Sequence, residues 1–175
     1  MAGNAFVLDD ESRNKGKFAK REYIGLDGQF SMASALGLSQ LRAEYLFGTQ
    51  PADRSSSKSP NASTLAIADT YIRNFGGGYV IFVQDLGRLP LSTVLKYDWY
   101  DPNTRVAKND IGLNGTDSAD LLQSTFGFGL LWRINDNIRL QAYYEINSNE
   151  TSQNLSAFAG DIENDVFTLR LQYKF

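Results

Sequence analysis

Apolar and polar residues alternate along most of the chain with a period of two. In the closing run 165–175, every odd position from 167 onward is apolar, whereas every even position from 168 onward is polar or charged. The same rhythm recurs in the runs 21–30, 38–47, 91–100, 125–134 and 138–147. Such alternation gives a β-strand one apolar and one polar face. Run 79–86 also reads as a strand, but both of its parities are apolar and its faces stay unassigned. With no helical periodicity, the pattern predicts an all-β fold of about seven strands.

The connections between these runs alternate between short and long. Short turns are predicted near residues 33–37, 87–90 and 135–137, and long polar connections at 49–76, 102–120 and 148–164. Antiparallel up-and-down outer-membrane barrels sort their links in this way, because turns lie at one rim and loops at the other. The run Gly76–Gly78 is interpreted as a flexible loop entering the following strand, and Tyr71 and Arg73 are candidates to fold inward near a constriction.

Alternation alone leaves two senses open, since a soluble ligand-binding barrel has the same period with its apolar face inside. Two features favour a transmembrane barrel. Charges lie in mid-strand on the polar faces, which a wet lumen tolerates better than a dry core. Aromatic residues on the apolar faces cluster near predicted strand ends, as in the girdles at lipid headgroups. One predicted girdle comprises Tyr45, Phe47, Tyr97 and Trp99 at the loop rim, and the other comprises Phe30, Trp132, Tyr173 and Phe175 at the turn rim.

The predicted lumen face carries more positive than negative charge. Basic residues there outnumber acidic ones seven to four when Arg21 and Asp27 are included. Basic side chains bias a pore toward anions, although charge pairing that keeps a barrel wall rigid explains any single residue equally well. The predicted pore-lining residues are Arg42, Lys96, Arg133, Arg139, Arg170, Lys174, Glu44, Asp98 and Glu145.

Composition narrows the chemistry further. The 175 residues contain no cysteine and no histidine, and the net charge is −3. These absences remove thiolate chemistry, the commonest general base and the commonest metal ligand, so we expect neither an enzyme nor a cofactor. A negative net charge argues against nucleic-acid binding. No apolar stretch is long enough for a membrane helix, whereas a membrane strand needs only about 9–11 residues.

The chain is expected to be a single barrel domain or a fragment of one, 1–175. The start lacks the pattern of a secretory signal, which favours a precursor that begins upstream. Counting strands back from a periplasmic Phe175 makes 1–19 an extracellular loop or partial strand and leaves the strands in 20–175. An even strand count is normal, so either further strands lie upstream or residues 2–8 supply an eighth. The first alternative predicts a pore; the second predicts a small, non-conducting barrel with a structural or surface-binding role.

Three segments resemble a known family. The closing run 165–175, the run K-Y-D-W-Y-D-P-N at 96–103 and F-A-K-R-E-Y at 18–23 are similar to the C-terminal portion of phosphate-selective porins of the O and P type. The resemblance implies a channel of about sixteen strands, commonly a homotrimer, in the outer membrane of a Gram-negative bacterium. Its implied partners are outer-membrane lipid and lipopolysaccharide, small hydrophilic solutes such as phosphate, and the barrel assembly machinery, which reads the terminal Phe175.

Overall fold

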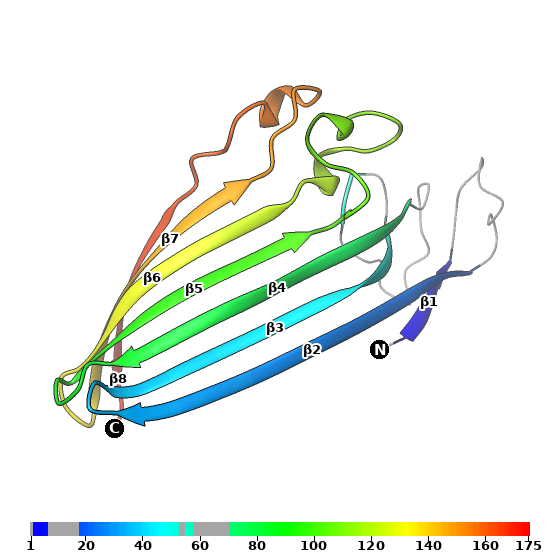
Figure 1. Ribbon diagram of the computed structural model, residues 1–175. Coiled ribbons are helices and arrows are strands. Elements are labelled where there is room, and N and C mark those ends of the chain that lie inside the picture. Colours follow the sequence, from blue (N-terminus) through cyan, green and yellow to red (C-terminus); the bar gives the residue numbers. More distant parts are fainter. Residues whose placement is uncertain (1, 7–17, 53–54, 58–70) are drawn as a thin grey trace.

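The computed structural model describes residues 2–6, 18–52, 55–57 and 71–175, with side chains from residue 21 onward. It confirms an all-β fold with antiparallel, up-and-down topology. Seven long strands follow one another in sequence order and a short strand precedes them (Figure 1). Their bounds are β1 (Ala2–Phe6), β2 (Phe18–Ser34), β3 (Gly37–Ala52), β4 (Tyr71–Asp85), β5 (Leu91–Asp101), β6 (Gln123–Arg133), β7 (Ile138–Asn149) and β8 (Val166–Tyr173).

The sequence left open whether this chain closes into a barrel by itself, and in the structure the sheet is not closed. The sheet runs from β1 to β8 in order, and within the described part of the chain these two edge strands do not pair with each other. β1 pairs only with the first residues of β2, from Phe18 to Glu22. β1 is therefore a short partial strand, one of the two alternatives that the sequence left for residues 1–19. None of the described residues forms a helix long and apolar enough to span a membrane.

Short and long connections alternate as predicted. The short links are 35–36, 86–90 and 134–137, and they gather at one end of the sheet, while the connections after β5 and β7 lie at the other (Figure 1). Two of the turns use glycine where the backbone enters the left-handed region, at Gly37 (φ 110°) and Gly87 (φ 60°). These two ends are called the turn end and the loop end below.

The prediction of a long connection at 49–76 was wrong at both of its limits. β3 continues to Ala52 and β4 begins at Tyr71, so Gly76–Gly78 lie inside a strand rather than in a flexible loop. The glycines fit because bulky neighbours occupy the space that side chains would fill. A Cβ on Gly78 would lie 3.0 Å from the Trp99 ring, and one on Gly77 would lie 3.2 Å from the Tyr100 ring. Glycine is a weak strand former in isolation, and here tertiary packing overrides that preference.

The register places the apolar parity of all seven long strands on one face of the sheet. It also settles β4, whose faces the sequence left open. Val80 lies between Ala43 and Tyr97 on the apolar face, whereas Ile81 lies between Arg42 and Lys96 on the other, polar face. A shift by one residue would have exchanged the two faces, so the pairing is strongly specified.

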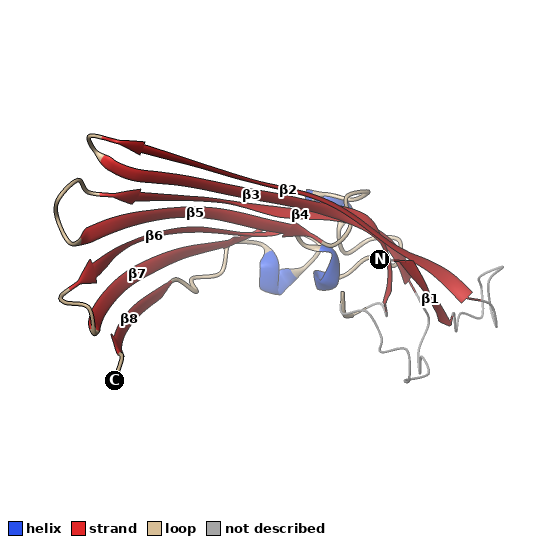
Figure 2. Cartoon of the chain, turned by 90° about the horizontal axis from the view of Figure 1, so that it is seen from below, coloured by secondary structure: helices blue, strands red, loops and turns tan. Residues whose placement is uncertain are grey.

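The sheet is curved rather than flat. Its strand ends at the turn end follow an arc, with the short 3-10 helices on the inner side of that arc (Figure 2). The residues that the structure describes do not cover either face of the strands along its length. Among the described residues, the buried apolar side chains are Pro51, Ala52, Phe75, Pro102, Ile111 and Leu121, and they lie toward the loop end. The sheet therefore has no dry core between two layers.

A compact layer forms instead from the two described long connections, 102–122 and 150–165, which carry the 3-10 helices η1 (Lys108–Asp110), η2 (Ser118–Asp120) and η3 (Ser156–Phe158). The buried Ser152 hydroxyl donates to the Ile111 carbonyl at 2.6 Å. The Asn154 side chain donates to the Asn109 carbonyl at 2.6 Å, and Glu150 accepts from the Lys108 backbone N–H at 2.7 Å. We name this layer the loop layer.

Aromatic rings also cover glycines on the polar face. Tyr143 of β7 lies across Gly127 and Gly129 of β6, so a Cβ on Gly127 would overlap the Tyr143 hydroxyl and one on Gly129 would lie 2.6 Å from the ring. Such a ring shields the backbone of a glycine-rich strand and fixes the register of the pair.

Replacing Gly127 with alanine is therefore expected to displace Tyr143 and destabilise the sheet by about 1–3 kcal/mol. Gly28→Ala is the matched control, because a Cβ at this strand glycine of β2 meets no atom within 4 Å. Alanine there should be neutral or stabilising by about 0.5 kcal/mol. Denaturant titration of both variants measures the difference, and equal stabilities would contradict the role assigned to Tyr143.

Candidate functional site

The polar face is the candidate functional surface, and its charges are sorted by level. Asp27, Glu44, Tyr79 and Asp98 are direct cross-strand neighbours on β2, β3, β4 and β5. We name the three carboxylates of this line the acidic row. Neighbouring like charges are destabilising in a dry sheet. Glu44 and Asp98 are half-buried and Asp27 is exposed, which keeps all three accessible to water.

Basic residues lie one level nearer the turn end and compensate part of this row. The Lys96 ammonium is 2.7 Å from the Asp98 carboxylate, and Arg42 donates from Nε to the Gln29 amide oxygen at 3.0 Å. Glu145, on β7, is opposite Gly127, the cross-strand partner of Lys96. These predicted pore-lining residues therefore lie at neighbouring levels of the polar face on β3, β5 and β7.

A second, basic group occupies the turn end. Arg133 and Arg139 are cross-strand partners on β6 and β7, and Arg170 and Lys174 follow on or after β8. Arg133 pairs with Asp85 at 3.2 Å, whereas no ion pair involves the other three within the described residues. We name Arg133, Arg139, Arg170 and Lys174 the basic end.

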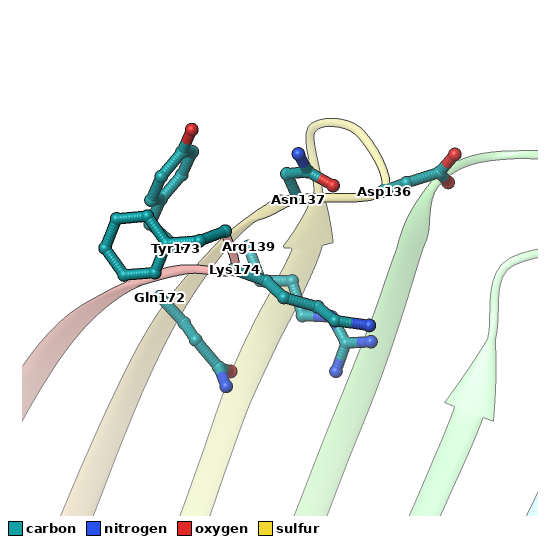
Figure 3. A pocket seen from close by; sticks show the side chains of 7 residues that line it. Asp136, Asn137, Arg139, Gln172, Tyr173 and Lys174 are labelled. Carbon is teal, nitrogen blue, oxygen red and sulfur yellow. The ribbon is translucent and has the colours of Figure 1, made fainter.

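Three side chains near the basic end point the same way. Arg139, Gln172 and Lys174 extend to one side of the strands and Tyr173 to the other (Figure 3). They border a hollow of about 410 Å³ together with Asp136 and others of the last turn. A hollow lined by a guanidinium, an ammonium and an amide offers several N–H donors, which suits an anion such as a carboxylate or phosphate.

A buried ion pair ties the loop layer to the sheet. Arg73 of β4 and Asp120 of η2 are only 3% and 1% exposed, and Arg73 Nε donates to Asp120 at 2.7 Å. Asn103 donates to the same carboxylate at 2.8 Å, as does the Asp117 backbone N–H at 2.9 Å. Burial alone raises the pKa of the Asp120 carboxyl, but these hydrogen bonds outweigh it and hold the pKa below its ordinary value. We name the Arg73–Asp120 pair the clasp.

The clasp was only partly foreseen. The sequence offered Tyr71 and Arg73 as residues that fold inward, and Arg73 does lie beneath the loop layer with its guanidinium 5.7 Å from the Tyr71 ring centroid. Asp120 was not singled out. The one local signal was its spacing from Asp117, which together form a capping box around η2.

Aromatic rings on the polar face were also missed. Tyr23 and Phe75 meet edge to face with centroids 5.2 Å apart, and Phe75 lies 6.2 Å from Tyr100. The rings lean over glycines of the strands beside them, because Gly48 lies between Tyr23 and Phe75 in the register and Gly77 is opposite Tyr100. The signal was present in these glycines, which leave room that only a neighbouring ring fills.

The predicted girdle residues all occupy the apolar parity, at the two ends of the face. Near the loop end, Tyr45, Phe47, Tyr97 and Trp99 form a connected cluster whose consecutive centroids lie 5.7–6.2 Å apart. Gly78 separates Tyr45 from Trp99 in the register, so these two rings meet above β4. Near the turn end, Tyr173 and Phe175 meet edge to face at 5.1 Å, and Trp132 and Phe30 lie on β6 and β2.

The acidic run at 161–165 serves the loop layer. Asp161 accepts from the Asn149 backbone N–H at 2.8 Å, and Asp165 accepts from the Tyr144 hydroxyl at 2.8 Å and from the Asn147 backbone at 3.1 Å. Within the residues that the structure describes, no group of three or more acidic side chains is arranged to hold a metal ion.

Comparison of the chain with models of protein families, with characterised proteins and with solved structures finds no match.

Proposed function

We propose that the chain forms part of an outer-membrane β-barrel whose polar face lines a water-filled channel for small hydrophilic solutes. One observation carries the proposal: the apolar face is continuous through seven strands, and its large side chains are exposed within the part of the chain that the structure describes. Phe128 and Leu130 are 43% and 42% exposed, and Leu169 is 63% exposed. An apolar surface of this extent is stable only against lipid or another apolar body.

The dimensions of the apolar face favour lipid. The run from Ile138 to Ile146 on β7 measures about 27 Å along the strand, which after tilting approaches the apolar band of an outer-membrane barrel. Rings near both ends of this face suit the two headgroup regions. Strands of 11 or 12 residues, as in β5, β6 and β7, are long enough to cross the bilayer.

The proposed channel passes solutes down their gradient without a cofactor, and the basic end gives it a modest preference for anions. The acidic row lies farther from the turn end along the channel wall and favours cations. The net ion preference is therefore set by the narrower of these two levels. Passage through a barrel with an open lumen requires more strands than are present here, since eight strands enclose little more than their own side chains.

Planar-bilayer recordings of the natural full-length protein test this proposal. We expect stepwise conductance with a reversal potential that favours anions. Arg139→Gln should lower the anion-to-cation permeability ratio by up to about twofold at low salt, because one positive charge leaves the channel wall and salt screens the effect. Arg88→Gln is the control, since Arg88 is an exposed basic residue of the turn 86–90 outside the strands. An unchanged permeability ratio in the Arg139 variant would contradict the proposal that the basic end favours anions.

A second candidate is a non-conducting outer-membrane barrel that binds partners at the cell surface. The ordered loop layer favours it, because two connections with a buried Ile111 and a buried ion pair offer a rigid surface at the loop end. Silent bilayers at high protein load would support this candidate over the channel. A homotrimeric state, recognition of Phe175 by the assembly machinery, contact with lipopolysaccharide and phosphate as a solute remain predictions drawn from the family resemblance.

A further inference from the structure

The polar face contains a hollow of about 270 Å³ above Gly77 of β4. Gly77 has no side chain and the Tyr100 ring leans over it, whereas its four neighbours on the same face are large. Phe75 and Tyr79 lie two residues before and after it on β4, and Leu46 and Tyr100 are its cross-strand partners on β3 and β5. The hollow therefore has a frame of three aromatic rings and one leucine, and its lining also includes Gly78 and Trp99.

Carboxylates form the rim of this hollow on its turn-end side. Glu44 and Asp98 flank Tyr79 as its direct cross-strand neighbours, and both line the hollow. Among the described residues, no lysine or arginine lines the hollow, and Lys96 compensates the rim carboxylate of Asp98 with its ammonium 2.7 Å away. Asp27, beside Glu44 in the register, adds a further negative charge.

We propose that this hollow binds a compact organic cation, an alkylammonium or quaternary ammonium group. Aromatic faces attract such cations through their quadrupoles, and the attraction grows when part of the water is excluded. The frame supplies the rings of Tyr79 and Tyr100 and an apolar wall at Leu46, and Glu44 supplies a carboxylate for the ion. An anion would meet the two carboxylates at the rim and is excluded by their charge.

The inference rests on the proposed function only in that the polar face must be wet. It adds that the channel wall has a binding site for organic cations at the level of the acidic row, and that this site is separate from the anion-favouring basic end. Organic cations are thereby expected to dwell at this level, whereas small inorganic anions pass it without binding.

The test is equilibrium binding of choline to the natural full-length protein in detergent micelles, followed by the NMR line width of the choline methyl groups. Its uncharged isostere 3,3-dimethylbutan-1-ol is the matched ligand, because the two differ in the positive charge and share the shape. We expect choline to bind at least about tenfold more tightly than the alcohol. Equal affinities would overturn the proposal.

Variants locate the site. Tyr100→Leu and the double variant Glu44→Gln/Asp98→Asn should each weaken choline binding about tenfold, whereas Tyr100→Phe, which keeps the ring, should preserve it. Glu145→Gln is the control for charge in general, since Glu145 lies on the same face outside the hollow. An equal loss in Glu145→Gln would show a diffuse charge effect and sink the assigned site.

Binding and conduction are separable in this design. Choline binding without bilayer conductance would leave the inference standing and reject the channel. Conductance without choline binding would reject the inference and keep the channel. Each variant is first checked for folding by its heat-modifiable mobility on electrophoresis, and Tyr100→Phe provides a folded reference if Tyr100→Leu fails to fold.

Discussion

Leu130→Arg is expected to lower the stability of the membrane-inserted protein by about 1–3 kcal/mol, because a basic side chain facing lipid costs about 2–4 kcal/mol at the bilayer midplane and less toward the headgroups. Leu130 lies on the apolar face of β6, and its cross-strand partners are Thr93 of β5 and Ala142 of β7. Leu130 lies within the proposed apolar band, two residues from the girdle residue Trp132, where a guanidinium has little water and no counter-ion.

Its neighbour supplies a matched control. Leu131 is adjacent in sequence and lies on the opposite, polar face, with Ser92 and Gln141 as its cross-strand partners. Leu131→Arg places the same charge in water, so its effect on stability should stay below about 1 kcal/mol. Denaturant titration of folding into lipid vesicles measures both variants. Equal costs, or a larger cost at Leu131, would contradict the assignment of the two faces.

Asp120→Asn is expected to open the clasp and destabilise the loop layer by about 3–5 kcal/mol, since it removes the carboxylate charge of Asp120 from its buried pair with the Arg73 guanidinium. Asp110→Asn is the control, because Asp110 is an exposed aspartate of the same connection. Limited proteolysis should cut 102–122 in the Asp120 variant and spare it in the control. In a channel, the same variant should also show noisier current, because this connection lies over the polar face.

The clasp also has a defined pH dependence. The folded pKa of Asp120 is lower than its ordinary value of 3.8, so the carboxylate contributes stability above that value and loses it as pH falls through the lowered folded pKa. Protease resistance of 102–122 should therefore persist from neutral pH down to about 3.8 and fall only below it. Asp120→Asn should show no such transition, and a loss of resistance already near pH 6 in the natural protein would contradict the clasp.

Replacing both members of the clasp separates the contribution of the ion pair from that of the other hydrogen bonds to Asp120. Arg73→Met/Asp120→Leu removes the buried charges together, and such exchanges are often neutral or stabilising. Part of the loss should remain here, because Asp120 also accepts hydrogen bonds from Asn103 and from the Asp117 backbone. Full loss in the double variant would mean that these hydrogen bonds, rather than the ion pair, hold the loop layer.

The strands were predictable from the sequence because their signal is local. A period of two identified six of the seven long strands, and the alternation of link lengths gave the up-and-down order. β4 was harder, because Ile81 and Val83 on its polar face are as apolar as Val80 and Phe82 on the other. The faces of β4 are set by its pairing with β3 and β5, and this pairing cannot be deduced from the sequence of β4 alone.

The site was less predictable because its determinants are non-local. Gly77 looks like part of a flexible loop until Tyr100 and Leu46 are placed beside it. Arg73 and Asp120 are 47 residues apart, and only the folding of 102–122 over the sheet brings them together. In the sequence, the charges of the acidic row and of the basic end could only be added into one total for the predicted lumen face. The strand register shows that they lie at two separate levels.

The most direct test of the account compares two adjacent positions of β7 in lipid vesicles of the full-length protein. Ala142 lies on the apolar face opposite Leu130 and Leu169, and Gln141 lies on the polar face opposite Leu131 and Arg170. This chain has no cysteine, so Ala142→Cys and Gln141→Cys each introduce one labelling site within it. A fluorophore at 142 should be quenched by brominated lipid and one at 141 by aqueous iodide. The reverse pattern, or quenching of both labels by iodide alone, would contradict the proposal that the apolar face meets lipid and the polar face meets water.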